Sequence, residues 1–170
     1  MSKIILMTGG ARSGKSRLAE NQALSLGSPA IYIATARIWD AETQARVEEH
    51  RARRLTGWRD IEAPLDLVGA LRDTDGGAPR LVDCLTMWLT NLMMENRDIE
   101  AEAEALIGCL PQLDAPVIFV TNEVGMGIVP ENALARRFRD AQGQLNQKIA
   151  AVADEVHLVT CGYALKVKPQ

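Results

Sequence analysis

Short apolar runs alternate with longer amphipathic segments along the chain, and this alternation predicts a mostly parallel β-sheet flanked by helices. The apolar runs have the length of buried strands. We predict strands at residues 4–8, 30–35, 58–62, 80–83, 117–121, 155–160 and, as an edge strand, 164–168. The segments between them predict helices at residues 16–26, 40–54, 65–72, 87–95, 98–110 and 131–153, with Asp40 and Asp98 as N-caps.

The chain has 170 residues, an ordinary size for one domain, and contains no internal repeat or low-complexity linker. Its two clearest loops, at residues 72–79 and 125–130, are too short to separate domains. We therefore predict a single α/β domain over residues 1–170.

The segment between the first predicted strand and the first helix fits the pattern G-x-x-x-x-G-K-[ST]. Its residues are Gly9, Gly10, Ala11, Arg12, Ser13, Gly14, Lys15 and Ser16. In this pattern the backbone N–H groups curl around phosphate oxygens, the lysine reaches the β- and γ-phosphates, and the serine ligates Mg²⁺. The N-terminus of the following helix adds a field that favours anions. The loop therefore predicts binding of a nucleoside triphosphate with Mg²⁺, and Lys15 as a catalytic residue.

Asp83 ends the predicted strand 80–83 with a carboxylate. Nucleotide-binding α/β proteins place an acid at such a position, beside the phosphate loop, to hold Mg²⁺ directly or through water. Many strands end in Asp, so only the loop upstream makes Asp83 a predicted metal ligand together with Ser16.

The predicted helix 40–54 has almost no apolar stripe. A histidine and three arginines recur on one face, at Arg46, His50, Arg53 and Arg54. A histidine among arginines tends to stay neutral, and a neutral imidazole is a competent nucleophile toward phosphorus. The alternative is a solvated helix with ion pairs Glu42–Arg46 and Glu49–Arg53. Because this helix has little apolar face to bury, the arginines around His50 are expected to matter more to the reaction than to stability.

Glu123 follows the predicted strand 117–121, at the edge of the sheet where open α/β proteins bind ligands. It is either a base or a partner of the metal site, or else part of a turn capped by Asn122. The next helix carries a cluster of arginines that is either a phosphate clamp or a solvated face: Arg136, Arg137 and Arg139.

Composition argues against nucleic acid as a partner and against a membrane-spanning segment. The net charge of −3 provides no global basic field for nucleic acid, and no apolar run approaches the roughly 18 residues of a membrane span.

Cys84, Cys109 and Cys161 lack any C-x-x-C spacing, so we interpret them as small buried hydrophobes in a reducing cytoplasm rather than as a zinc or disulfide framework. His157 alternates within a predicted strand, which favours a structural role.

Six stretches in order resemble one family, the bifunctional adenosylcobinamide kinase / adenosylcobinamide-phosphate guanylyltransferases of cobalamin biosynthesis. They are GGARSGKSRLAE (9–20), YIATA (32–36), ARVEEHRARR (45–54), GWRDIEAP (57–64), VTNEVGMGIVPENALARRFRD (120–140) and ADEVHLVTCG (153–162). The run TNEVGMGIVPEN together with GGARSGKS is highly specific to that family. The resemblance implies a RecA-like P-loop fold and a homotrimer.

In that family a histidine in the helix after the second strand, followed by a basic residue, takes GMP from GTP as a phosphoramidate. His50-Arg51 stands at that place, and Glu49 precedes it where some members carry another histidine. The resemblance further implies contacts to the guanine nucleotide, besides those of the loop, at Ala34, Thr35, Ala36, Arg51, Ala52, Arg53, Arg54, Glu62 and Asp83.

The implied substrates are ATP or GTP for the kinase step, GTP for the guanylyl step, and adenosylcobinamide as a corrinoid substrate. Two other functions remain open from the residues themselves. One is a P-loop small-molecule kinase without a histidine intermediate, and the other is a non-catalytic module that binds a nucleoside triphosphate.

Overall fold

The computed structural model describes residues 2–38, 40–54 and 56–169, without the side chains of residues 42, 43, 46, 50 and 53. Its strands form one seven-stranded sheet of order β3-β2-β4-β5-β1-β6-β7. The strands are β1 (Ile4–Gly9), β2 (Ala30–Ala34), β3 (Trp58–Glu62), β4 (Arg80–Asp83), β5 (Val117–Val120), β6 (Glu155–Thr160) and β7 (Tyr163–Lys168). All pairs are parallel except β6 with β7, so β7 is the antiparallel edge strand.

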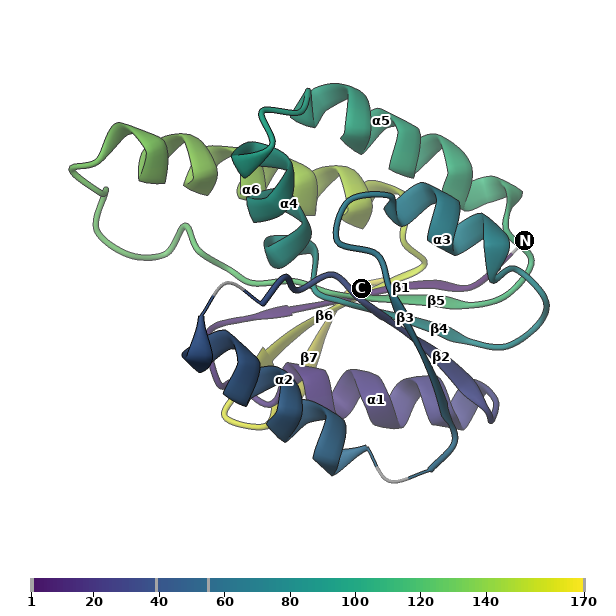
Figure 1. Ribbon diagram of the computed structural model, residues 1–170. Coiled ribbons are helices and arrows are strands. Elements are labelled where there is room, and N and C mark those ends of the chain that lie inside the picture. Colours follow the sequence, from purple (N-terminus) through teal and green to yellow (C-terminus); the bar gives the residue numbers. More distant parts are fainter. Residues whose placement is uncertain (1, 39, 55, 170) are drawn as a thin grey trace.

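Helices cover both faces of the sheet (Figure 1). They are α1 (Lys15–Leu26), α2 (Ala41–Arg53), α3 (Leu67–Asp73), α4 (Leu85–Met94), α5 (Ile99–Cys109) and α6 (Ala133–Val152), with a short 3₁₀ turn at Leu110–Gln112. In the view of Figure 1, α1 and α2 lie below the sheet and the other four helices above it. Within the described residues, no helix has the length and apolar character needed to cross a bilayer.

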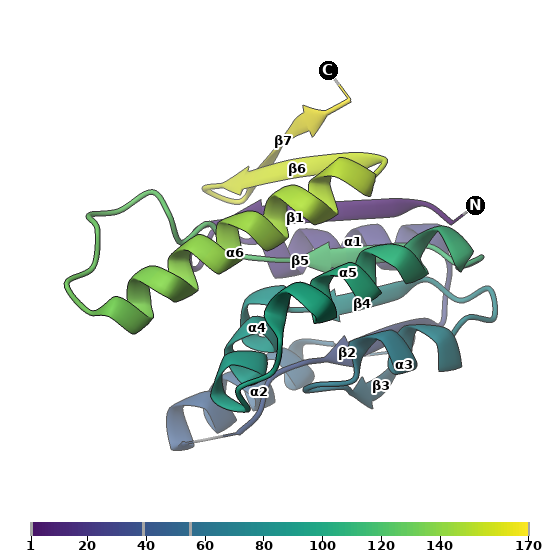
Figure 2. The ribbon, with the colours of Figure 1, turned by 90° about the horizontal axis from the view of Figure 1, so that it is seen from above.

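The apolar runs are buried on both faces, as the central strands of a parallel sheet require. Along β1, Ile4 and Leu6 pack into the core beneath α3 to α6, whereas Ile5 and Met7 pack against α1. Figure 2 shows β1 near the middle of the sheet, between β5 and β6. The predicted strands are confirmed to within one residue at each end.

Helix starts deviate more from the sequence prediction, because side-chain caps set them. The helix predicted from residue 65 begins at Leu67, since Asp66 accepts a hydrogen bond from the Gly69 N–H at 2.8 Å. The helix predicted from residue 131 begins at Ala133, where Asn132 is the cap. The predicted cap Asp98 is confirmed, with its carboxylate 3.1 Å from the Ala101 nitrogen.

A buried arginine side chain holds together the segments that lead into β4 and β5, at the amino ends of these strands. Arg80 is fully buried, and it donates to the Leu71 carbonyl at 2.6 Å and to the Ala115 carbonyl. It also pairs with Asp75 at 3.0 Å, while Asp75 accepts from the Ala115 N–H at 3.0 Å. Burial works to raise the pKa of Asp75, but the donated backbone hydrogen bonds and Arg80 outweigh it and lower that pKa.

Glu155 is the acid at the centre of a cluster where β6 begins. Lys3 lies 2.7 Å from its carboxylate, His157 2.9 Å and Lys166 3.6 Å, which confirms a structural role for His157. Hydrogen bonds from Lys3 and His157 lower the pKa of Glu155 to about 2.

We expect this cluster to stabilise the fold in a pH-dependent way. Because the folded-state pKa of Glu155 lies below its ordinary value of 4.5, the contribution is complete above that value and is lost as the pH falls toward about 2. Urea unfolding at pH 7 and at pH 3 measures it, with Glu155→Gln as the variant and Glu104→Gln, an exposed carboxylate, as the control. The cost of Glu155→Gln should be larger at pH 7; an equal cost at both pH values would contradict the assignment.

Candidate nucleotide-binding site

The phosphate-binding loop occupies the turn between β1 and α1, and two of its glycines leave no room for a side chain. A Cβ on Gly9 would lie 2.4 Å from the Val159 carbonyl oxygen of β6. Gly14 has a φ of +94°, and a Cβ there would lie 3.1 Å from the Cα of Gly162. The loop therefore requires glycine at both positions for close backbone approach and, at Gly14, for left-handed geometry.

The turn between β6 and β7 supports the loop directly. The Gly162 N–H donates to the Ser13 carbonyl at 2.8 Å, and the Ser13 N–H donates to the Gly10 carbonyl at 3.3 Å. Nothing in the local motif indicated the first contact, since its partners lie at opposite ends of the chain.

Lys15 lies within the loop rather than in solvent. Only 8% of the residue is exposed, and its ammonium group donates to the Gly10 carbonyl at 3.0 Å. Burial lowers the pKa of Lys15, while the nearby Cys84 and Asp83 act in the opposite direction. The predicted catalytic cation and the predicted metal ligand thus lie close to each other, although the two residues come from different elements.

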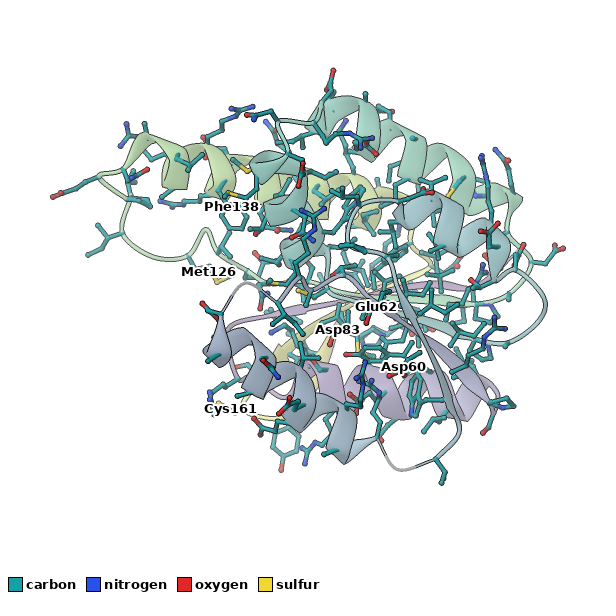
Figure 3. The ribbon with its side chains drawn as sticks, viewed as in Figure 1. Asp60, Glu62, Asp83, Met126, Phe138 and Cys161 are labelled. Atoms are coloured by element: carbon teal, nitrogen blue, oxygen red, sulfur yellow. The ribbon has the colours of Figure 1, made fainter. Side chains whose placement is uncertain are left out.

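The strand register brings the remaining predicted positions to the same edge. Ala34 of β2 is paired with Asp83 of β4 and with Glu62 of β3, and Asp83 is paired with Val120 of β5. Figure 3 shows Asp83, Glu62 and Asp60 in the same region, between α2 and the upper helical layer. Their contacts with a nucleotide stay predictions, but their common location follows from the parallel register.

Thr35 has a buried structural role that the sequence did not indicate. Its hydroxyl donates to the Cys84 carbonyl at 2.7 Å and accepts from the Cys84 N–H at 2.8 Å. The side chain of Asn91, on α4, donates to the Thr35 carbonyl at 2.7 Å. These bonds hold the ends of β2 and β4 and the start of α4 together beside Asp83.

Tyr32 is the residue of the site that sequence reasoning missed most clearly. It lies on β2, is 4% exposed, and donates its hydroxyl hydrogen to Oδ2 of Asp83. Burial, together with the charge of Asp83, raises the pKa of Tyr32, so the hydroxyl keeps its proton and remains a donor.

The residue that follows α2 packs on the same tyrosine. The Arg54 guanidinium carbon lies 3.4 Å from the centroid of the Tyr32 ring, and a terminal nitrogen lies 2.8 Å from Oδ2 of Asp60. The Arg54 side chain is only 5% exposed. The expectation that this segment has little surface to bury is therefore wrong at Arg54, because its side chain is buried against an aromatic ring and paired with a carboxylate.

Most other side chains of the predicted basic face lie outside the described part of the structure. The side chains of His50, Arg46 and Arg53 are not among those described, and neither is that of Glu42, so both predicted ion pairs remain outside the described residues. Arg51 lies mostly in solvent, with its Nε 3.5 Å from Asp60.

Glu123 lies against the first residue of the phosphate loop. Its N–H donates to the Gly9 carbonyl at 3.2 Å, and its carboxylate accepts from the Thr8 hydroxyl at 2.7 Å. The Asn146 amide of α6 lies 3.5 Å from the same carboxylate oxygen. Asn122 donates its side-chain amide to Thr86 on α4 at 3.0 Å and to the sulfur of Cys84, the N-cap of that helix, at 4.0 Å. These side-chain contacts join Asn122 to α4 and do not cap a turn.

Two arginines of α6 hold the preceding loop through hydrogen bonds to its carbonyl groups. Arg136 donates to the Pro130 and Glu131 carbonyls at 2.9 and 2.5 Å, and Arg139 donates to the Gly125 carbonyl at 2.6 Å. The loop they hold extends beyond the sheet and exposes Met126 (Figures 2 and 3). Loop attachment is thus a role of Arg136 and Arg139 that neither sequence interpretation included.

The three cysteines are free thiols with different surroundings. Cys109 is buried, as predicted, whereas Cys161 is exposed in the β6–β7 turn, so the prediction of a buried side chain is wrong there. Cys84 caps α4 by accepting from the Met87 N–H at 3.4 Å, and burial raises its pKa to about 11. Within the described part of the chain, no group of three His, Cys, Asp or Glu side chains is placed to hold a metal ion.

The sheet order, the glycine loop between β1 and α1 and the carboxylate ending β4 define a P-loop nucleotide-binding fold of the RecA-like type. An ATPase of the type III secretion system of pathogenic bacteria shares it with a TM-score of 0.61 and 11% identity, over 96% of this chain and 56% of that one. The flagellar accessory protein FlaH from Methanocaldococcus jannaschii does so with a TM-score of 0.53 and 12% identity, over 98% and 78%.

The chain belongs to the cobinamide kinase / cobinamide phosphate guanyltransferase family, whose model matches residues 5–167. It is 46% identical to the bifunctional adenosylcobalamin biosynthesis protein CobP of Pseudomonas aeruginosa over 166 residues, 96% of both chains. It is 42% identical to the Escherichia coli protein CobU of the same description over 181 residues, 97% of this chain and 99% of that one. Both the predicted fold class and the family resemblance are confirmed.

The burial of Arg54 predicts a measurable role in stability. Arg54→Ala removes a cation–π contact of about 1–2 kcal/mol and the Asp60 ion pair, so the thermal midpoint should fall by about 4–8 °C. Arg51→Ala is the matched control, because Arg51 pairs with the same carboxylate from a side chain that is 59% exposed. Calorimetry checks both variants, and equal midpoints for the two would contradict the packing role of Arg54.

Proposed function

We propose that this chain phosphorylates adenosylcobinamide with ATP or GTP and then transfers GMP from GTP to the product, giving adenosylcobinamide-GDP. The observation that carries the proposal is the phosphate loop with Lys15 beside Asp83, in a chain of the cobinamide kinase / guanyltransferase family. The curated relatives are described as bifunctional adenosylcobalamin biosynthesis proteins and match nearly their whole length.

In the kinase step, the hydroxyl oxygen of the cobinamide side arm attacks the γ-phosphorus, and the bond to the β,γ-bridging oxygen breaks. The nucleoside diphosphate leaves, and the hydroxyl proton is lost to a base or to water. The backbone N–H groups of residues 9–16 orient the phosphates, and Lys15 offsets negative charge on them. Glu123, held beside Gly9, is our candidate for the group that accepts the proton or supports the metal site.

The donor set beside the loop suits Mg²⁺. Ser16 offers a hydroxyl oxygen and Asp83 a carboxylate oxygen, which are the hard ligands this ion prefers, with water completing the shell. An Mg²⁺ ion held by these residues would supply positive charge to the phosphates. The Asp83 carboxylate also accepts a hydrogen bond from the Tyr32 hydroxyl.

In the guanylyl step, the neutral imidazole of His50 attacks the α-phosphorus of GTP and expels pyrophosphate. An oxygen of cobinamide phosphate then attacks the same phosphorus, the P–N bond breaks, and free imidazole is regenerated. The attachment of the end of α2 to Tyr32, next to Asp83, supports the proposal that His50 works at the same edge of the sheet as the phosphate loop. The remaining nucleotide contacts proposed are Ala34, Thr35, Ala36, Arg51, Ala52, Arg53, Arg54 and Glu62.

Assembly and location are part of the proposal. We expect a homotrimer in the cytoplasm, and the group of exposed apolar side chains in the loop after β5 (Met126, Ile128 and Val129) supports self-association, because an exposed apolar patch gains from being covered. Light scattering on the purified chain measures the oligomeric state.

His50 is tested by covalent labelling. Incubation with α-labelled GTP and Mg²⁺ should label the protein, and the label should resist mild alkali and be lost in acid, as a phosphoramidate is. His50→Ala should abolish the label and largely keep kinase activity, whereas the control His157→Ala should still be labelled. Label in His50→Ala would assign the nucleophile to another residue. Kinase activity without any label in the wild type would favour a small-molecule kinase without a histidine intermediate.

Lys15 is tested in the kinase step. Lys15→Ala should reduce phosphoryl transfer by about 10²–10³-fold or more, because the variant loses the lysine that reaches the β- and γ-phosphates in this motif. Lys166→Ala, on β7, is the control and should keep the wild-type rate. Transfer of label from γ-labelled ATP to cobinamide measures both, and a near-normal rate for Lys15→Ala would remove the loop from the kinase site.

A further inference from the structure

A single buried aromatic ring, Tyr32, contacts both halves of the proposed site. Its hydroxyl donates to Asp83, the acid beside the phosphate loop. Its face carries the Arg54 guanidinium, 3.4 Å from the ring centroid, and its ring lies 5.8 Å from that of Trp58 in an edge-to-face arrangement. Arg54 directly follows α2, the helix that contains His50.

The surroundings make the hydroxyl of Tyr32 unusual for its position. The ring belongs to the apolar cluster between the sheet and α1, among Ile5, Leu81 and Ala23. A phenylalanine would fill that space equally well, whereas a buried hydroxyl loses water and needs a partner. The only described hydrogen bond of this hydroxyl is the one to Asp83.

The contact with Arg54 is equally specific. An arginine side chain that is 5% exposed has given up most of its water, and here the ring face and the Asp60 carboxylate, 2.8 Å away, replace it. The end of α2 is thereby attached to Tyr32 on β2 and to Asp60 on β3. Tyr32 in turn contacts Asp83 directly.

We propose that Tyr32 is a positioning residue that orients the Asp83 carboxylate for the metal-bound nucleotide and holds the end of α2 through Arg54. The inference rests on the proposed function, since it gives Asp83 and His50 the roles assigned above. An Asp83 carboxylate that is already held loses less rotational freedom when the cation binds. The same ring limits where the helix with His50 can lie, so the metal site and the guanylyl site share one support.

The chain offers variants that separate the two contacts. Tyr32→Phe removes the hydroxyl and keeps the ring under Arg54. Tyr32→Leu removes both contacts. Asp60→Ala frees Arg54 from β3 and leaves the Tyr32–Asp83 hydrogen bond in place. Thermal unfolding of each variant checks that the fold is kept, and if Tyr32→Leu fails to fold, the other two still decide the proposal.

The experiment titrates Mg²⁺ against binding of a fluorescent, non-hydrolysable GTP analogue to the full chain, and then measures the rate of covalent labelling by α-labelled GTP. For Tyr32→Phe we expect about tenfold more Mg²⁺ at half-saturation, and a labelling rate that returns to within about twofold of the wild type at saturating Mg²⁺. For Asp60→Ala we expect slower labelling with the wild-type Mg²⁺ midpoint. Tyr32→Leu should show both defects.

A wild-type Mg²⁺ midpoint in Tyr32→Phe would overturn the positioning of Asp83, and wild-type labelling in Asp60→Ala and Tyr32→Leu would overturn the support of α2. Failure of the proposed function looks different. If the wild-type chain binds the analogue with Mg²⁺ but takes no label, the histidine intermediate is wrong, and the magnesium titration still decides the role of Tyr32 toward Asp83.

Discussion

The parallel pairing of β1 on both sides determines where the site can form. β1 is hydrogen-bonded to β5 along one edge and to β6 along the other, and both of its faces are buried. The chain can therefore leave the sheet only beyond its last paired residue, Gly9, where it passes close to the Val159 carbonyl. The loop that follows is held at the carboxyl edge, and every other strand of the parallel set ends at that edge as well.

The polar groups of the site come from the carboxyl ends of the strands and from the residues that follow them. β4 ends in Asp83, β2 ends beside Thr35, and the chain after β5 returns Glu123 to the start of the loop. Hydrogen bonds between these connections, such as those of Thr35 with Cys84, hold them in register with one another. The buried amides of α6 extend this support, because Asn146 and Gln142 bond to Thr121 next to the loop after β5.

Local patterns predicted the strands and the phosphate loop, because each depends on residues that are neighbours in sequence. Buried parallel strands are continuous apolar runs, and the loop motif specifies its own backbone. Helix starts were less predictable, since Asp66 and Asn132 compete with nearby residues for the cap position. Tyr32 escaped prediction for a different reason: its partner Asp83 is 51 residues away, and nothing near Tyr32 indicates a polar neighbour.

The same limit applies to Arg54, whose burial depends on a ring in another strand, and to Thr8, which meets Glu123 over 115 residues. Pairing across such distances is decided by sheet order, which single-sequence patterns do not contain. The family resemblance supplied roles for His50 and the loop, but it carried no information about which residues hold them in place.

The support of the phosphate loop by the β6–β7 turn has a consequence for protein synthesis. The Gly9-to-Ser16 segment leaves the ribosome well before Gly162, whose N–H donates to the Ser13 carbonyl. β6, whose Val159 carbonyl lies against Gly9, likewise emerges after the loop. A nascent chain that has emerged only as far as β5 thus possesses the complete motif, but the loop makes its contacts with β6 and the β6–β7 turn only after those segments have been synthesised.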